Sequence, residues 1–285
     1  MKIPEAAVER LFFLAALFCA SLALFILVFM LVLGRPLLTG DFLPRLLTEP
    51  WLPDRGLYGI LPMLVGTVSI ALLALLLALP VSLGCAVLIS VIRPPRFGPL
   101  LERVVEFLTG MPTVVIGFVG VFLLVPLLRE NLDAGSGRCI LAAAIGLAGL
   151  IAPTLILFFS DAFSRVPAGW RQAAAALGCS RSQIFFRIIL PHSLRGLASG
   201  VVLALGRAVG DTLIALMLAG NAVAVPHSVL SPARTLTAHI AMFFAADFES
   251  LEFKVIFACG LLLYLVSLLL TLLIRGLERR RRCRI

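Results

Sequence analysis

Charged residues are scarce in this sequence: they make up 14% of its 285 residues, whereas 61% are hydrophobic. Soluble globular domains carry about 25% charged residues, so this composition excludes that class. The formal net charge of +9 could suggest a nucleic-acid partner. However, the basic residues stand between apolar runs and form no stripe with interleaved aromatics, so we expect no nucleic acid to bind. The composition indicates an integral membrane protein.

Residue patterns for chemistry are also lacking. The only lysines are Lys2 and Lys254, and neither belongs to the GxxxxGK[ST] pattern that cradles nucleotide phosphates. The six cysteines show no CxxC spacing, and the three histidines form no metal constellation with nearby carboxylates. We therefore expect no ATP site, catalytic group, metal or cofactor in this chain.

Long apolar runs dominate what is present. A helix of about 20 residues crosses a bilayer, and the first run exceeds the apolar region of a cleavable signal. The sequence thus predicts an all-α, polytopic membrane protein with six transmembrane helices, at residues 11–33, 62–92, 104–128, 139–160, about 197–218 and about 254–274.

The basic residues predict the orientation of these spans. Six spans place both termini on one side, where the termini and loops hold 16 lysines and arginines, against 7 in the opposite loops. Basic loops stay in the cytoplasm. We therefore expect both termini and the 161–196 loop to be cytoplasmic.

The 161–196 loop is too long and too regular to be a simple turn. A run of strong helix formers, 173–177, ends at Gly178, which suits the left-handed position after a helix. Ser180 and Gln183 match a capping box that begins a second helix. The loop therefore predicts a helical hairpin.

The second hairpin helix should present an apolar face that includes Phe185, and Pro191 should end it. Such a face suits a helix lying on the lipid surface. It equally suits a helix that docks into a groove on a cytoplasmic partner. These residues alone leave both interpretations open.

A family resemblance favours docking. The segment from Gln172 through Ala173 to Gly178, followed by Ile188-Ile-Leu-Pro191, resembles the cytoplasmic coupling motif of ABC importer permeases, which reads Glu-Ala-Ala, then Gly, then Leu-Pro. Gln172 replaces the usual glutamate. Further segments are similar to the permease subunits of phosphate ABC importers, and more to the PstC-like than to the PstA-like subunit: 110–117, 123–129, 206–212, 220–221 and 234–238.

The resemblance covers about residues 60–275 and implies the type I ABC importer permease fold, in a bacterial cytoplasmic membrane. It implies three partners besides membrane lipid: an ATP-binding cassette ATPase dimer, a second, PstA-like permease subunit, and an extracytoplasmic phosphate-binding protein. ATP hydrolysis would then occur on a separate subunit. The ATPase would dock on Gln172, Ala173, Gly178, Phe185 and Pro191.

The resemblance also divides the chain into three parts. Residues 1–61 would form an N-terminal helix and an extracytoplasmic loop, and residues 62–275 the permease domain. Residues 276–285 would form a basic cytoplasmic tail, which could hold anionic lipid.

Arg207 and Asp211 are the candidate substrate residues, together with Thr212. Arg207 and Asp211 are four residues apart in the fifth predicted span, so we expect them on one helix face, with Arg207 near the membrane midplane. Charges at that depth are costly and face a cavity or a partner. They could merely neutralise each other. Alternatively, Arg207 could bind an oxyanion while Asp211 accepts the proton that hydrogen phosphate has and sulfate lacks.

The function implied is phosphate import. Asp211 replaces the family's usual glutamate, so another oxyanion, such as molybdate or sulfate, stays open as the substrate. A secondary transporter that needs no ATPase is the alternative from another class, and a scaffold role is a third. On the opposite side, Arg234 and Thr235 could contact the binding protein or simply form a turn.

Overall fold

The computed structural model describes residues 5–38, 42–132, 135–243 and 250–282. Within these ranges the chain is helical except for loops and one small antiparallel hairpin, in which β1 (Trp51–Leu52) pairs with β2 (Leu57–Tyr58). The helices are α1 (Glu5–Leu38), α2 (Phe42–Thr48), α3 (Leu61–Val87), α4 (Phe97–Thr109), α5 (Thr113–Val119), α6 (Val125–Leu132), α7 (Ile140–Ser164), α8 (Ala168–Ala176), α9 (Arg181–Ile184), α10 (Leu190–Gly210), α11 (Leu213–Leu218), α12 (Leu236–Phe243) and α13 (Leu251–Arg282).

Six helical segments are long and apolar enough to cross a membrane, which confirms the all-α, six-span class. Three of them include a π-helical turn: η2 (Leu88–Ile92) ends α3, η3 (Gly120–Leu124) joins α5 to α6, and η4 (Phe185–Ile189) joins α9 to α10. The spans are Val8–Gly34, Leu61–Ile92, Thr113–Leu132, Ile140–Ser164, Arg181–Gly210 and Leu251–Gly276.

The predicted third span, 104–128, is wrong. The chain leaves the helix after Thr109, and Pro112 is extended, with φ −61° and ψ 136°. Proline lacks an N–H and disfavours helix in the residue before it, so α4 and α5 form separately. Val105 on α4 packs with Ile156 on α7, and the membrane-crossing segment begins at Thr113.

Pro191 does not end the second hairpin helix, contrary to the prediction. In the wide turn η4, the Leu190 N–H donates to the Phe185 carbonyl five residues back. Pro191 therefore falls in the first turn of α10, where a missing N–H costs little. The hairpin helix and the fifth span are consequently one helical segment, Arg181–Gly210.

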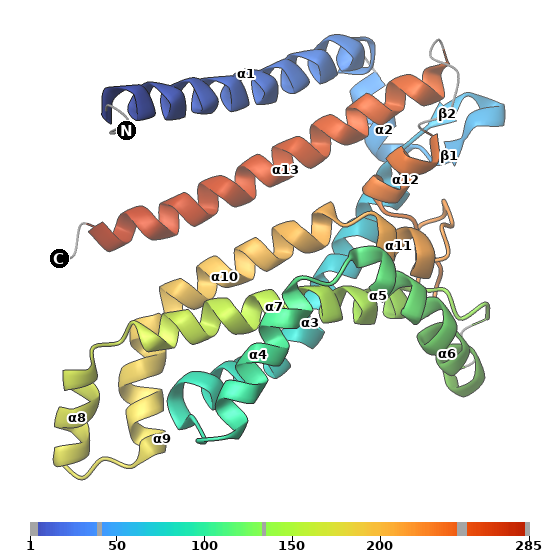
Figure 1. Cartoon of the computed structure of the whole chain (residues 1–285). Coiled ribbons are helices and arrows are strands. Elements are labelled where there is room, and N and C mark those ends of the chain that lie inside the picture. Colours follow the sequence, from blue (N-terminus) through green and yellow to red (C-terminus); the bar gives the residue numbers. More distant parts are fainter. Residues whose placement is uncertain (1–4, 39–41, 133–134, 244–249, 283–285) are drawn as a thin grey trace.

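The core is built around α7. Its buried face includes the fully buried Ala142, Ala143 and Ala144, whose small side chains allow neighbouring helices to approach closely. Figure 1 shows α3 and α10 beside α7, with α1 and α13 lying together at the outer side. The apolar side chains of α1 are mostly exposed, so that this helix presents its surface to lipid or to another subunit.

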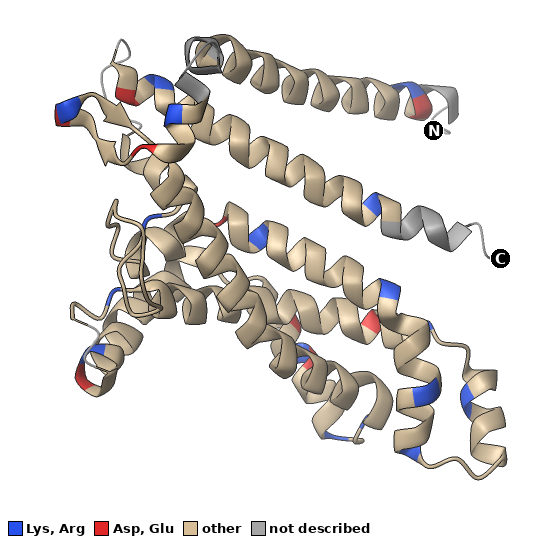
Figure 2. Cartoon of the chain, turned by 180° about the vertical axis from the view of Figure 1, so that it is seen from behind, with Lys and Arg blue, Asp and Glu red and all other residues tan. Residues whose placement is uncertain are grey.

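The start of α1, the end of α13 and the α8–α9 hairpin lie at the same end of the bundle (Figure 1). Charged residues occur mainly near the ends of the long helices and on the hairpin (Figure 2). The side chains of the basic tail from residue 277 onward lie outside the described residues, although α13 continues as backbone to Arg282.

The contact between α3 and the segment before α12 gives a test of this packing. A Cβ atom at Gly66 would overlap the Arg234 carbonyl oxygen, whereas a Cβ at Gly84 on the same helix would meet nothing within 4 Å. We expect Gly66→Ala to lower the unfolding free energy by about 1–3 kcal/mol, the usual cost of overpacking. Gly84→Ala should be neutral or slightly stabilising. Thermal unfolding of both variants in detergent measures this, and equal stability would contradict the packing.

Candidate functional site

The chain breaks its helix at Asp211, and this break organises the first candidate site. Helix α10 ends at Gly210, Asp211 is extended with φ −71° and ψ 135°, and α11 begins at Leu213. The predicted continuous helix over 197–218 is therefore wrong, and Arg207 and Asp211 do not share a helix face. Instead, the Asp211 Oδ2 atom accepts a hydrogen bond of 2.9 Å from the Ile214 N–H. Asp211 thus caps α11, the role that Asp favours at helix starts.

Helix α12 secures the break from the other side. The Thr237 hydroxyl donates to the Asp211 carbonyl at 2.7 Å. Because the Thr237 hydroxyl proton is used in this bond, the Thr237 oxygen must accept in its 3.0 Å hydrogen bond with the Thr235 hydroxyl. The Thr235 hydroxyl in turn accepts a hydrogen bond from the Ala238 N–H. All these side chains are buried. Two backbone groups at the break, the Asp211 carbonyl and the Ile214 N–H, therefore find partners inside the protein, as an irregular segment among membrane spans requires.

Arg207 lies in the last turn of α10, half-buried, one turn before the break. Its Nη1 atom donates to the Thr154 hydroxyl on α7 at 2.7 Å. Among the described residues the only ion pair is the exposed one between Arg165 and Asp161, so Arg207 has no carboxylate partner there. No ion pair within 4.0 Å joins Arg207 to Asp211, although the charge of Arg207 still acts on the Asp211 carboxylate.

Two threonines lie on neighbouring elements: Thr154 on α7, which bonds Arg207, and Thr212 at the start of α11. Thr212 is half-buried at the start of α11, and its carbonyl accepts the Leu216 N–H. Thr154 follows Pro153 inside α7, and the sequence analysis missed it. A threonine beside a proline in a mostly apolar helix could have marked Thr154 as a candidate site residue. Only the fold shows that its hydroxyl bonds Arg207.

A second polar cluster lies beside the β-hairpin, at the opposite end of the bundle from α8–α9 (Figure 1). Arg234 is half-buried; its Nε atom donates to the Asn221 carbonyl at 3.0 Å, and its guanidinium lies 6.0 Å from the Phe243 ring. Thr235 is 4% exposed, so its side chain faces the interior and not the surface of this chain. Of the two residues expected on the binding-protein side, only Arg234 reaches solvent appreciably.

His239 belongs to the same cluster and is fully buried. Its ring lies 4.4 Å from that of Trp51 and 4.8 Å from that of Phe243. Burial, and secondarily the charge of Arg234, lowers the pKa of His239 to about 3. The imidazole is therefore neutral at physiological pH and helps to fix α12 against the hairpin.

The α8–α9 hairpin forms as predicted. Gly178 adopts φ 78° after α8, in the left-handed region. The Gln183 N–H donates to the Ser180 hydroxyl at 3.3 Å, and the Ser180 N–H donates to the Gln183 side chain at 2.8 Å. The capping box is confirmed, and it fixes the angle between the two helices.

The predicted docking residues differ in exposure. Gln172, Ala173, Gly178 and Pro191 are exposed, whereas Phe185 is half-buried with its ring 5.6 Å from that of Phe163. Apolar side chains that the sequence analysis did not single out are more prominent: Leu177 at the hairpin tip is 85% exposed, and Phe186 is 64% exposed. A pattern of apolar residues identifies the helix, but only its packing shows which of them point outward.

Comparisons with known proteins agree with this architecture. Residues 78–282 match a family described as "Binding-protein-dependent transport system inner membrane component". The chain is 34% identical to the probable ABC transporter permease protein YqgH of Bacillus subtilis (strain 168), over 85% of this chain and 78% of that protein. It is 30% identical to the phosphate transport system permease protein PstC of Mesorhizobium japonicum, over 82% of this chain and 78% of that protein.

Solved structures show the same fold at low identity. A bacterial alginate ABC transporter, in complex with its periplasmic protein bound to an alginate pentasaccharide, matches with a TM-score of 0.67 at 15% identity, over 98% of both chains. The MetNI methionine ABC transporter matches with a TM-score of 0.57 at 20% identity, over 80% of this chain and 96% of that chain. The chain therefore belongs to the family of binding-protein-dependent transport system inner membrane components: it is a multi-pass permease subunit of an ABC importer, and not an enzyme.

Proposed function

We propose that this permease subunit conducts inorganic phosphate, and that the anion binds Arg207 on its way. The observation that supports this most is the guanidinium itself: it is half-buried near the end of α10 and has no carboxylate partner among the described residues. A guanidinium has five N–H donors, and one of its nitrogens, Nη1, already donates to Thr154. The others suit an oxyanion, which a planar fork of donors binds well. Relatives named as phosphate permeases support the choice of anion.

Asp211 has two proposed roles. Its cap on α11 holds the break that ends α10 one turn after Arg207. A carboxylate has further lone pairs, and these can accept the proton of hydrogen phosphate while repelling fully ionised sulfate. Thr212 would line the same path.

The proposed mechanism is alternating access driven by a separate ATPase dimer that docks on the hairpin. The helical segment that starts at the hairpin, Arg181–Gly210, ends three residues beyond Arg207. The segment bends at η4 (Figure 1), and beyond the bend the 21 residues of α10 extend for about 30 Å to the break, so a movement of the docked hairpin would pass to the break through α10. A second, PstA-like permease would complete the path. A phosphate-binding protein would deliver the anion at the opposite end, where Arg234 lies, with both termini cytoplasmic.

Substitution of Arg207 tests the anion path. In the reconstituted complex with its binding protein, Arg207→Ala should reduce phosphate uptake at least about tenfold, because the fixed charge is lost. Arg207→Lys should restore part of it, since Lys is a point charge without the bidentate fork. Thr154→Val, which removes only the hydroxyl partner, is the matched control and should have the smaller effect. Uptake unchanged in Arg207→Ala, with the complex assembled, would remove Arg207 from the mechanism.

Substitution at the hairpin tip tests docking. Leu177→Asp should prevent the ATPase from co-purifying, because it places a charge on the most exposed apolar side chain of the hairpin. It is a cleaner test than Phe185→Asp, which would also break the contact with Phe163.

Gly169→Asp at the start of α8 is the matched control. A side chain there meets nothing within 4 Å, and an acidic residue suits the first turn of a helix. Retention of the ATPase by Leu177→Asp to the same extent as by Gly169→Asp would contradict docking through the tip.

A further inference from the structure

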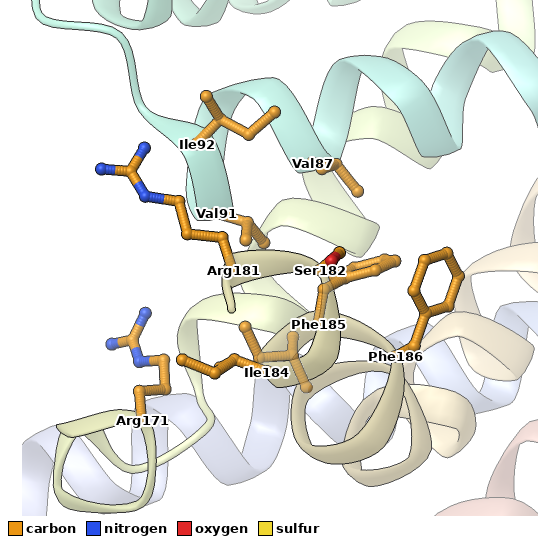
Figure 3. A pocket seen from close by; sticks show the side chains of 10 residues that line it. Val87, Val91, Ile92, Arg171, Arg181, Ser182, Ile184, Phe185 and Phe186 are labelled. Carbon is orange, nitrogen blue, oxygen red and sulfur yellow. The ribbon is translucent and has the colours of Figure 1, made fainter. Parts of the chain in front are cut away.

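A cavity of about 690 Å³ separates the α8–α9 hairpin from the end of α3. Val91 of η2 faces Ile184 and Phe185 of the hairpin across it (Figure 3), and Ile92 lines its edge. The exposed ring of Phe186 continues this apolar wall. The cavity therefore offers a mostly apolar surface of the kind that takes a hydrocarbon chain.

Two arginines line one side of the cavity, and the Ser182 hydroxyl lies beside Phe185 among the apolar side chains (Figure 3). These are Arg171 of α8 and Arg181 of α9, and Figure 3 shows their guanidinium groups on the same side, away from Phe185 and Phe186. None of the described residues that line the cavity is acidic. Within the described part of the chain, neither guanidinium forms an ion pair or hydrogen bond. Two free positive charges thus stand beside an apolar surface.

The position of the cavity narrows the choice of ligand. Its two walls are ends of membrane spans: one span ends at Ile92, and another begins at Arg181. The cavity therefore lies at one end of two segments that are each long enough to cross a membrane. Where such segments leave a bilayer, they meet the lipid headgroups. A molecule with an anionic head and an apolar tail matches both the chemistry and the depth, and membranes supply such molecules at this level.

We propose that this cavity binds one anionic phospholipid from the membrane leaflet on the hairpin side. Its phosphate would lie on Arg171 and Arg181, and an acyl chain on Ile92, Phe185 and Phe186. Because the cavity lies between the docking hairpin and α3, a bound lipid would fill the space behind the hairpin and hold it in place. This site is independent of which anion the permease conducts.

The test uses the full complex, reconstituted in vesicles of phosphatidylcholine and phosphatidylglycerol and then extracted in detergent. Native mass spectrometry measures the lipid retained by each complex. We expect native protein to retain phosphatidylglycerol in preference to phosphatidylcholine. The double variant Arg171→Gln/Arg181→Gln should reduce that retention at least about tenfold, since each basic residue near a membrane surface contributes about a fivefold factor.

Arg187→Gln, an exposed arginine of the same helical segment that does not line the cavity, is the matched control and should retain phosphatidylglycerol as native protein does. Val91→Trp, which fills the cavity without changing charge, should also lose the lipid and serves if the double variant fails to assemble. Equal retention of phosphatidylglycerol by native protein, the double variant and Val91→Trp would overturn the proposal, as would equal retention of the two lipids by native protein.

A photoreactive side chain identifies the occupant directly. With Phe186→p-benzoylphenylalanine, illumination of the assembled complex should give an adduct with the mass of phosphatidylglycerol. An adduct with the ATPase or with a second permease would show that a protein segment fills the cavity, and would overturn the lipid assignment.

Discussion

The structure depends on one unbroken helical segment, Arg181–Gly210, which begins in the exposed hairpin and ends inside the bundle. Its continuity rests on the π-helical turn η4, which brings Pro191 into the first turn of α10. The segment changes direction at this turn (Figure 1), as expected where a wide turn and a proline interrupt the regular hydrogen bonds of a helix. The proposed coupling uses this segment, because it starts at the hairpin and ends three residues beyond Arg207.

Side-chain hydrogen bonds also hold the end of this segment in place. Asp211 caps α11, Thr237 donates to the Asp211 carbonyl, and Thr235 supports Thr237. These bonds use polar groups that a continuous helix would have satisfied by itself, so the break costs little. They also occupy Asp211 with the backbone and leave Arg207 without a carboxylate among the described residues. Charges among membrane spans are normally paired, and the absence of an ion pair at Arg207 in the described part of the chain is the reason that we propose it as a contact of the anion.

Much of this architecture was predictable from local patterns. Hydropathy identified all six spans, and the Ser180–Gln183 box and Gly178 placed the hairpin. The failures are at three sites where tertiary contacts decide. Pro112 separates α4 from α5, and Pro191 lies in the first turn of α10 without ending the helical segment. The chain leaves α10 at Asp211. A proline stops, kinks or joins a helix according to the hydrogen bonds around it. The role of Asp211 depends on α12, whose first residue lies 25 positions further along the chain.

The most direct test of the central claim is the transport of radiolabelled anions by the native complex, reconstituted with its ATPase and binding protein. The account predicts ATP-dependent uptake of phosphate that excess unlabelled sulfate or molybdate does not reduce, because the path past Arg207 and Asp211 favours an anion that still has a proton. ATP-dependent uptake of sulfate or molybdate in place of phosphate would contradict the phosphate assignment. Uptake of phosphate without ATP would contradict the coupling through the helical segment Arg181–Gly210.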